Sequence, residues 1–554
     1  MKRIKNFVCY TGIWILPVMI IVFVITKREM DPSYHLSLAQ LGQISIISAV
    51  LMLFNTGKNS IALMNGKENF GPFDALFDDI GPGDDRRKAM YPPVPEALLR
   101  KEPCGIVLGK EREKYVCNDL CVGGSHNTIV VGETGCGKTS TVVLDTILCN
   151  HESDTAILAV DVKGELISKG TKTGNARILR IAPGDSESCG YDPFGPLKYT
   201  YSEQELTDTV STIAYSLIPI NAESKNSFWE NSARDLLTAC FVYYLRQGIQ
   251  NVPDIADEIA AAPIESVIEE IMAESDPSSV ERKLVTCFAG MASETLSGIN
   301  AQAMDALSVF IKDESIRYML RDNPERITAK ELDRGKSIYI CIPEHKLNTY
   351  ARLLHLILNQ TFSSLEQRPE GSGKVLIIVD ELARILSAGK IDKLENALET
   401  LRSRECSLML ITQSTDALER AYRKSEVEAL LQNCPYKVIL SSTAKGTTDN
   451  VIRWAGKYRS RRVSQTKGRS TGTNVSYEDR DRVQASDMLD LPQKDEAIII
   501  TPQGYFRIKK TPYYSDKRIS VIAREVTEHN ARYNKIKKEV KQKISNTTES
   551  GCCK

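Results

Sequence analysis

The 554-residue sequence has no excess of charge of either sign, because 71 Lys and Arg residues balance 71 Asp and Glu residues. Overall charge therefore gives no argument for binding to nucleic acid, and such contacts would have to come from local basic patches. No internal repeat is evident either. The length predicts two or three domains, and an apolar share of 42% is ample for large hydrophobic cores.

The Cys-x-x-Cys spacing is also missing, although the sequence has 14 cysteines. Cys240 and Cys406, among others, lie in apolar stretches, which is typical of reduced core thiols in a cytosolic domain. Cys117, Cys121 and His126 lie close together in the sequence but lack a clear fourth ligand, so a structural role is favoured over a zinc site.

What the sequence does contain is a Gly-x4-Gly-Lys-Thr loop at 132–139, the pattern that wraps nucleotide phosphates. An apolar run at 129–131 precedes the loop and a helix-like run at 140–144 follows it, which is the strand–loop–helix context that the pattern requires. We therefore predict nine nucleotide-binding residues: Gly132, Glu133, Thr134, Gly135, Cys136, Gly137, Lys138, Thr139 and Ser140.

The parts of this loop have different physical roles. Glycines let the backbone approach a polyphosphate, so that successive N–H groups and the start of the following helix face the anion. Lys138 adds a positive charge for the outer phosphates, and the hydroxyl of Thr139 is suited to coordinate Mg²⁺. The predicted cofactors are ATP and Mg²⁺. A glycine-rich turn without function is the alternative.

A second strand is expected to complete the site. Residues 375–379 are apolar and mostly β-branched and end in Asp380 and Glu381, as expected for a buried parallel strand that delivers acids to the ligand edge of a sheet. Asp380 would hold Mg²⁺ through water, and Glu381 would polarise the attacking water. Acids that only cap a strand end are the plainer alternative.

Cys136 lies inside the loop and close to the start of a helix, whose field favours a thiolate. We therefore hypothesise that alkylation of this thiol blocks ATP turnover and that bound nucleotide protects it. A Cys136→Ser variant that is as sensitive to alkylation as the wild type would contradict this hypothesis.

The first residues of the chain have a different composition. The segment 7–26 is free of charge and long enough to cross the hydrocarbon layer as a helix, and a second charge-free segment at 36–54 is weakened by glutamines and serines. We predict two spanning helices, with a cleaved signal peptide as the alternative for the first and an interfacial helix for the second. Lys2, Arg3 and Lys5 place the chain start inside, so we expect a multi-pass protein of the cytoplasmic (inner) membrane with its ATPase body in the cytoplasm.

Strand-like runs alternate with helical patterns in the remainder, which implies crossover connections and a parallel sheet, so the predicted fold class is α/β. Between about 201 and 334 the strand signals vanish and helical spacing dominates, which indicates an inserted all-α domain. The predicted strands are Thr128–Val131, Ala156–Val160, Ile178–Ile181, Ser337–Ile342, Val375–Val379, Leu408–Ile411 and Val438–Ser441.

The predicted domains follow from these changes of pattern. They are a membrane anchor at 1–68, a nucleotide-binding domain in two parts at 69–200 and 335–520, the inserted all-α domain at 201–334, and a basic C-terminal tail at 521–554.

Two late segments are rich in basic residues. The segment 457–474 looks like a mobile loop whose basic side chains could hold DNA phosphates without reading sequence, although a solvated loop is the plainer interpretation. Its basic residues are Lys457, Arg459, Arg461, Arg462, Lys467 and Arg469. Beyond Arg532 a Lys-rich tail predicts a solvated helix or disorder.

Together these features resemble the type IV coupling proteins, the membrane-anchored ATPases that deliver DNA and protein substrates to conjugation and type IV secretion channels. The resemblance covers nearly the whole chain, and the order of its motifs makes it more specific than the phosphate loop alone. Besides the membrane segments, it is carried by Gly132–Thr139, Asp161–Leu166, Tyr191–Phe194, Phe228-Trp229 in the helical insertion, Asp380-Glu381 and Ile411–Ser414.

The resemblance implies a RecA-like P-loop NTPase domain and a ring, expected to be a homo-hexamer, with nucleotide at subunit interfaces and a central passage for DNA. It assigns Gln413 to the γ-phosphate region, where this residue would couple hydrolysis to movement. It assigns Arg402 to the site of the neighbouring subunit, with Arg404 as the competing candidate; an arginine there stabilises transition-state charge. The predicted catalytic residues are Lys138, Glu381, Arg402 and Gln413. The segment 161–165 stays open between a structural turn and a nucleotide contact.

The expected function is ATP-driven transfer of conjugative DNA, which would be held without sequence preference and as a single strand during transfer. Expected partners are a relaxase or effector proteins, the components of a type IV secretion channel and the membrane. One alternative is a docking receptor in which ATP only switches conformation. Another is a DNA translocase of the chromosome-segregation type, which the helical insertion and the lack of a C-terminal winged-helix-like DNA reader disfavour.

Overall fold

A computed structural model of the protein describes residues 92–120, 126–185, 187–198, 201–220, 227–466 and 472–551, with the backbone alone for 461–466, 472–476 and 540–551. The chain divides into two compact units at 89/90, and only the second is described here. The predicted membrane helices at 7–26 and 36–54, and Cys121, lie outside the described residues. None of the helices in the described ranges has the length and hydropathy needed to span a bilayer.

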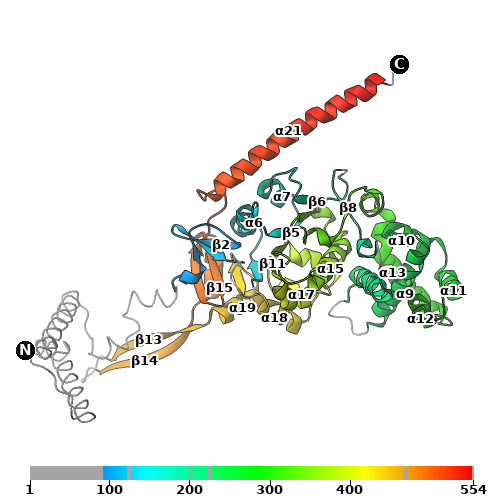
Figure 1. Ribbon diagram of the computed structural model, residues 1–554. Helices are drawn as coiled ribbons and strands as arrows, with labels where there is room; N and C mark the ends of the chain where they lie inside the picture. Colours follow the sequence, from blue (N-terminus) through cyan, green and yellow to red (C-terminus); the bar gives the residue numbers. More distant parts are fainter. Residues whose placement is uncertain are drawn as a thin grey trace, which may run out of the picture. The chain divides into compact units, whose positions relative to one another are not determined.

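The centre of the described unit is a twelve-stranded sheet with the order β1-β3-β2-β16-β15-β12-β4-β11-β10-β5-β9-β6 (Figure 1). The section from β12 to β6 is parallel throughout. Its strands are β4 (Thr128–Val131), β5 (Ala156–Asp161), β6 (Ile178–Ile181), β9 (Ser337–Cys341), β10 (Val375–Val379), β11 (Cys406–Thr412) and β12 (Tyr436–Ile439). All seven predicted strands are therefore confirmed, with β12 beginning and ending two residues earlier than predicted.

The remaining five strands are antiparallel, so the predicted parallel sheet is extended by an antiparallel section that the sequence did not indicate. They are β1 (Leu99–Arg100), β2 (Ile106–Glu111), β3 (Lys114–Asn118), β15 (Glu496–Thr501) and β16 (Gly504–Lys509). β2 and β3, like β15 and β16, are joined by two residues, as in tight hairpins. Because no helix separates these strands, they do not belong to the alternating pattern on which the parallel prediction was based.

Alternate residues of each central strand enter two different hydrophobic cores. In β10, Val375, Ile377 and Val379 pack in one core, whereas Leu376 and Ile378 pack in the other. A strand buried on both faces needs an unbroken aliphatic run, and each such side chain stabilises the fold by about 1.5–3 kcal/mol relative to exposure. The helices of the body include α6 (Leu144–Asn150), α7 (Glu165–Gly170), α15 (Ala351–Gln367), α16 (Leu382–Ile385), α17 (Leu394–Thr400), α18 (Lys424–Gln432), α19 (Lys445–Ala455) and α20 (Ala485–Asp490).

Between the short parallel pair β7 (Gly190–Tyr191) and β8 (Arg326–Ile327), the described chain forms only helices. The first of them begins at Ser202, whose hydroxyl accepts a hydrogen bond from Glu205 N in a capping box. These helices are α8 (Glu203–Leu217), α9 (Phe228–Arg246), α10 (Val252–Ala261), α11 (Ile264–Glu274), α12 (Val280–Thr286), α13 (Ser293–Lys312) and α14 (Glu314–Arg317). The domain boundaries stay a prediction.

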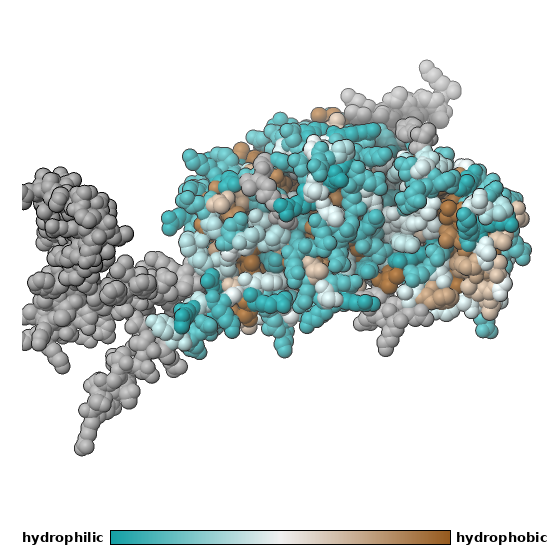
Figure 2. Space-filling view, turned by 60° about the horizontal axis from the view of Figure 1, so that its bottom comes forward, coloured by the Kyte–Doolittle hydropathy of each residue, from teal (hydrophilic) through white to brown (hydrophobic). Residues whose placement is uncertain are grey.

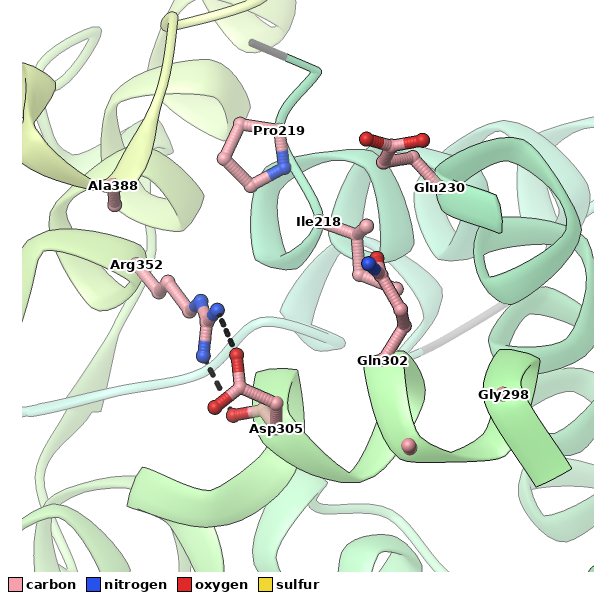
Figure 3. Close-up of a pocket in the computed structure, with 9 residues that line it drawn as sticks. Ile218, Pro219, Glu230, Gly298, Gln302, Asp305, Arg352 and Ala388 are labelled. Atoms are coloured by element: carbon pink, nitrogen blue, oxygen red, sulfur yellow. Dashed lines mark hydrogen bonds and ion pairs between the residues drawn. The ribbon is translucent and has the colours of Figure 1, made fainter. Parts of the chain in front are cut away.

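A cavity of about 520 Å³ lies where these helices meet the body (Figure 3). Two of the residues that line it, Arg352 of α15 and Asp305 of α13, form an ion pair with Nη2 to Oδ2 at 2.5 Å. Most of the surface seen in Figure 2 is hydrophilic, and apolar residues gather on the side where Figure 1 places α9 to α13. The cavity is lined by none of the predicted nucleotide-binding residues.

The segment predicted as a mobile loop at 457–474 instead contains most of a hairpin, so that prediction is wrong for its described residues. β13 (Lys457–Thr466) and β14 (Gly472–Asp481) pair antiparallel over their whole length and form a sheet of their own. Polar residues predominate in both strands, which made the segment look like a loop. The pairing shows that backbone hydrogen bonds, not apolar alternation, define this element.

The Lys-rich end of the chain is helical: α21 runs over Ile519–Gly551. Its first turns bury Ile519 and Val526 against the body. Asn530 fixes the next turn to the end of α7, because its Nδ2 donates to Thr171 O at 2.9 Å and its Oδ1 accepts from Thr173 N at 2.7 Å. Of the two possibilities left open for this tail, a helix or disorder, the described residues show the helix.

Candidate nucleotide-binding site

The phosphate loop joins the end of β4 to a π-helical turn, η2 (Thr139–Val143), which continues into α6. Gly135 and Gly137 have φ angles of +82° and +98°, a backbone region open to glycine at little cost. At Gly132 a Cβ atom would lie 2.5 Å from Cys136 Sγ, so only glycine fits there. The glycine positions of the motif are therefore required by the local geometry.

Lys138 is only 9% exposed, and its ammonium group bonds to the loop itself. Nζ donates to Gly132 O at 2.6 Å and to Glu133 O at 3.1 Å. No carboxylate among the described residues forms an ion pair with this lysine, and two backbone carbonyl oxygens hold its ammonium group. An anion inside the loop is the partner that such a cation lacks.

The other loop residues differ in exposure. Thr134 and Gly135 are exposed, Thr139 and Ser140 are half-buried, and Cys136 is buried. The Cys136 thiol lies against Gly132, so a reagent has to open the loop to reach it, and the alkylation hypothesis stays a prediction.

Neighbouring strands bring the other predicted residues to the same edge of the sheet. β11 lies between β4 and β10, with Thr412 opposite Val131 and Leu410 opposite Val379. The residues that follow these strands are therefore close together: Gly132 N donates to Thr412 O at 3.2 Å, and Gln413 Nε2 donates to Glu381 Oε2 at 3.3 Å. The phosphate loop, Gln413 and the pair Asp380-Glu381 form one cluster.

The two acids of this cluster influence each other. Burial, together with the charge of Glu381, raises the pKa of Asp380 to about 6, and the positive charge of Lys138 opposes this effect. Glu381 begins α16 (Leu382–Ile385) in the left-handed region, with φ +53°, and its N–H donates to Asp380 Oδ1 at 3.0 Å. Two adjacent carboxylates beside a phosphate loop suit a divalent cation, which would remove their repulsion.

Asp161 is the last residue of β5, the strand next to β10, but its carboxylate is used by the turn that follows it. Oδ2 accepts a hydrogen bond from Ile167 N at 2.9 Å, and Gly164 completes the turn with φ +69°. Burial raises the pKa of this carboxyl group. Of the two roles left open for 161–165, the geometry favours a structural turn.

Arg402 is not at the site of its own chain. It lies in η8 (Leu401–Arg404), before β11, whereas Gln413 follows the other end of the same strand. Arg402 is exposed, and no hydrogen bond or ion pair of its guanidinium group is found within the described part of the chain. Arg404 is partly buried, and its guanidinium group lies 4.0 Å from Glu370.

Four residues that the sequence did not predict support the loop from late parts of the chain. Ser441 Oγ accepts from Glu133 N at 2.9 Å, and Thr443 N donates to the Glu133 carboxylate at 2.8 Å. Lys510 Nζ donates to Cys136 O at 3.2 Å, and Tyr513 N donates to Ser140 O at 2.9 Å. No local pattern marks them, since each lies hundreds of residues from the loop.

Comparison with known proteins extends these observations. A family model described as Type IV secretory system Conjugative DNA transfer matches residues 94–543. Protein VirD4 of Rhizobium rhizogenes is 24% identical over 416 residues, which are 73% of this chain and 60% of that protein. Protein VirD4 of Agrobacterium fabrum is 23% identical over 430 residues, 75% of this chain and 63% of that protein. The chain thus spans about three fifths of the length of these curated relatives.

Among solved structures, the plasmid coupling protein TrwB in complex with the non-hydrolysable ATP analogue ADPNP is similar, with a TM-score of 0.59. The sequence identity is 17%, and the match covers 75% of this chain and 91% of TrwB. TrwB in complex with ADP and Mg²⁺ matches with a TM-score of 0.56 at 17% identity, over 70% of this chain and 84% of TrwB. At this identity the likeness shows the fold, which is that of an α/β RecA-like NTPase.

Proposed function

Because the chain belongs to the family of type IV secretory system conjugative DNA transfer proteins, we propose that it is a coupling protein ATPase. In this role it brings a relaxase–DNA complex, or protein substrates, to a type IV secretion channel and drives their transfer by ATP hydrolysis. The observation that carries the proposal is the cluster of the phosphate loop, Gln413 and Asp380-Glu381 at one edge of the sheet.

ATP and Mg²⁺ fit the residues of this cluster. The N–H groups of the loop and Lys138 would hold the phosphates, while Thr139 and Asp380 would hold the metal ion, Asp380 through water. The raised pKa of Asp380 supports a cation at this place, since an empty site disfavours its charge. Bound Mg²⁺ supplies positive charge that stabilises the transferred phosphoryl group. The complexes of TrwB with ADPNP and with ADP and Mg²⁺ support both ligands.

Hydrolysis is assigned to Glu381 and Gln413. Glu381 lies beside the phosphate loop and would orient and polarise the attacking water. Glu381 forms a hydrogen bond with Gln413, the residue that follows β11. A movement of Glu381 on cleavage of the γ-phosphate would therefore change the contacts of Gln413 at the end of β11. This pair is suited to couple hydrolysis to movement of the neighbouring strand.

Arg402 is assigned to the nucleotide site of the adjacent subunit, in a ring that we propose to be a homo-hexamer. Its position before β11, away from its own loop, agrees with action on a neighbour. Its exposure and free guanidinium group favour it over Arg404, which is placed near Glu370 in its own chain. An arginine in trans would stabilise charge in the transition state.

DNA is proposed to contact the hairpin β13–β14 through phosphates. The stretch 461–476 contains Arg461, Arg462, Lys467 and Arg469 and no acidic residue. Arg461 and Arg462 are neighbours in β13, so this stretch carries two adjacent positive charges. A two-stranded hairpin alone is marginally stable in water, and a polyanion would stabilise it.

We also propose that the protein is anchored in the cytoplasmic membrane by two helices at 7–26 and 36–54, with the ATPase body in the cytoplasm. The charge-free composition of the two segments and the basic residues before the first support this location.

The Glu381→Gln substitution separates a motor from a docking receptor that uses ATP only as a switch. We expect this variant to bind ADPNP with wild-type affinity but to lose DNA-stimulated ATP turnover by at least about 100-fold, because general-base assistance is removed. Conjugative transfer should disappear with turnover. Glu405→Gln, the same change at an exposed residue before β11, is the matched control and should leave turnover and transfer intact. Wild-type transfer by Glu381→Gln would support the docking receptor instead.

A further inference from the structure

Lys510 lies in a late part of the sequence and contacts the phosphate loop. It follows β16, and its Nζ donates to Cys136 O at 3.2 Å across 374 residues of sequence. Its backbone N donates to Asp495 O at 2.7 Å, which holds the lysine at the end of the β15–β16 hairpin. The side chain is half-buried, so this contact is shielded in part from water.

The residues after Lys510 bind the helix that follows the loop. Tyr513 N donates to Ser140 O at 2.9 Å. Three residues later, Asp516 accepts from Lys110 Nζ at 2.7 Å and from Tyr115 Oη at 2.6 Å. Burial opposes the charge of Asp516, but the hydrogen bonds from Lys110 and Tyr115 outweigh it and lower its pKa to about 2. The segment 510–516, here called the C-terminal clamp, is therefore fixed to the body at both ends.

The carbonyl that Lys510 contacts belongs to a critical peptide unit. The C=O of Cys136 and the N–H of Gly137 are parts of one planar trans peptide and point in opposite directions. Gly137 has φ +98°, and glycine allows the preceding peptide to rotate at little cost. An ammonium group on the carbonyl resists that rotation and keeps the Gly137 N–H directed away from Lys510. In this orientation we expect the N–H to face a bound phosphate.

We propose that Lys510 is a positioning residue of the nucleotide site. It locks the Cys136–Gly137 peptide in the orientation that binds phosphate, and it adds positive charge behind the loop. The inference rests on the proposed nucleotide-binding function, and it deepens that function by adding a residue outside the phosphate-binding motif. Because Lys510 is the first residue of the C-terminal clamp, nucleotide affinity also depends on how this segment is held.

The test measures the affinity of the full-length protein for a fluorescent ADPNP analogue and the steady-state kinetics of ATP hydrolysis. Lys510→Met should weaken binding at least about tenfold, as expected for loss of a charge-assisted hydrogen bond. Lys510→Arg should restore most of the affinity. The KM for ATP should rise with little change in kcat, because the peptide N–H binds phosphate equally in the ground and transition states. Lys509→Met removes a charge from the exposed neighbouring residue and should change neither value.

The reference variant Lys138→Ala distinguishes an error in the proposed nucleotide site from an error in the proposed role of Lys510. If Lys138→Ala keeps wild-type affinity, the proposed nucleotide site itself is wrong. If Lys138→Ala loses binding while Lys510→Met binds as the wild type, the role of Lys510 is overturned and the site stands. If Lys510→Met does not fold, it is replaced in the test by Lys510→Gln, which keeps a hydrogen-bond donor but has no charge. Wild-type affinity of Lys510→Gln would show that the charge of Lys510 does not contribute to nucleotide binding.

Discussion

We expect the carboxyl group of Asp380 to make nucleotide binding depend on pH. Its pKa is raised to about 6 by burial and by Glu381, so below this pH a proton competes with Mg²⁺ for this carboxyl group. The ordinary pKa of an aspartate is lower, so ionisation of Asp380 costs folding free energy as pH rises to about 6. A bound metal ion offsets that cost, because it stabilises the ionised form.

We therefore predict that the contribution of Mg²⁺ to nucleotide affinity falls as pH drops through about 6. The measurement is the dissociation constant of ADPNP between pH 5 and 8, with Mg²⁺ and with EDTA. Asp380→Asn should lose the Mg²⁺ contribution at every pH, whereas Asp449→Asn, at an exposed aspartate, should behave as the wild type. A Mg²⁺ contribution that does not change over this range would show that Asp380 does not hold the metal ion.

Among the elements, the hairpin β13–β14 has a charge distribution that predicts a salt effect. Near its base, Arg480 pairs with Glu478 at 3.1 Å, but the stretch 461–476 holds no acid. Replacing Arg461 and Arg462 by Gln should therefore reduce the slope of log K for DNA against log salt by about 1.5, since each phosphate contact contributes about 0.7–0.9. Fluorescence anisotropy with labelled DNA at several salt concentrations measures this slope.

The matched control for the hairpin replaces two arginines near its base, Arg480 and Arg482, by Gln. It removes the same charge from residues that lie next to acids in the sequence, Asp479 and Asp481. An equal change of slope in both double variants would mean that net charge, and not this part of the hairpin, determines DNA affinity.

How much of the fold was predictable differs between elements. Most of the parallel strands were found because they are largely aliphatic and buried on both faces, as in Val375–Val379. The strands β2, β3, β15 and β16 were missed because tight hairpins interrupt the alternation of strand and helix. The hairpin β13–β14 was taken for a loop, because its strands are polar on both faces.

In the candidate site, residues within local sequence motifs were predictable, whereas residues that contact the site from distant parts of the sequence were not. The phosphate loop and the acids after β10 are contiguous motifs with a defined chemistry, so their meeting could be expected from the order of parallel strands. Ser441, Thr443 and Lys510 could not be predicted, because their contacts with the loop depend on how β12 and β16 are placed in the sheet. The position of Arg402 also needed the strand direction of β11.

For the whole molecule, a ring with arginines acting in trans predicts complementation between two inactive variants. Glu381→Gln chains keep Arg402 but cannot hydrolyse ATP, and Arg402→Ala chains keep the loop and both acids. In equimolar mixed oligomers about a quarter of the interfaces combine the two intact halves, if subunits assemble at random. ATP turnover should therefore return to roughly that fraction of the wild type.

Arg404→Ala distinguishes the two candidate arginines. If Arg402 acts in trans, Arg404→Ala alone should retain turnover, because its guanidinium group lies near Glu370 of the same chain. Mixtures of Glu381→Gln and Arg402→Ala that stay inactive, although the chains co-assemble, would contradict catalysis across the interface.

The dependence of the phosphate loop on Lys510 has a consequence for synthesis of the chain. The two contacting residues lie 374 positions apart, and at about 5–20 residues per second a ribosome needs roughly 20 to 75 s to pass from one to the other. A nascent chain therefore carries its phosphate motif long before the lysine that steadies it is translated. Until then the loop lacks this support, so a nascent chain that already carries the motif should bind nucleotide more weakly than the folded protein.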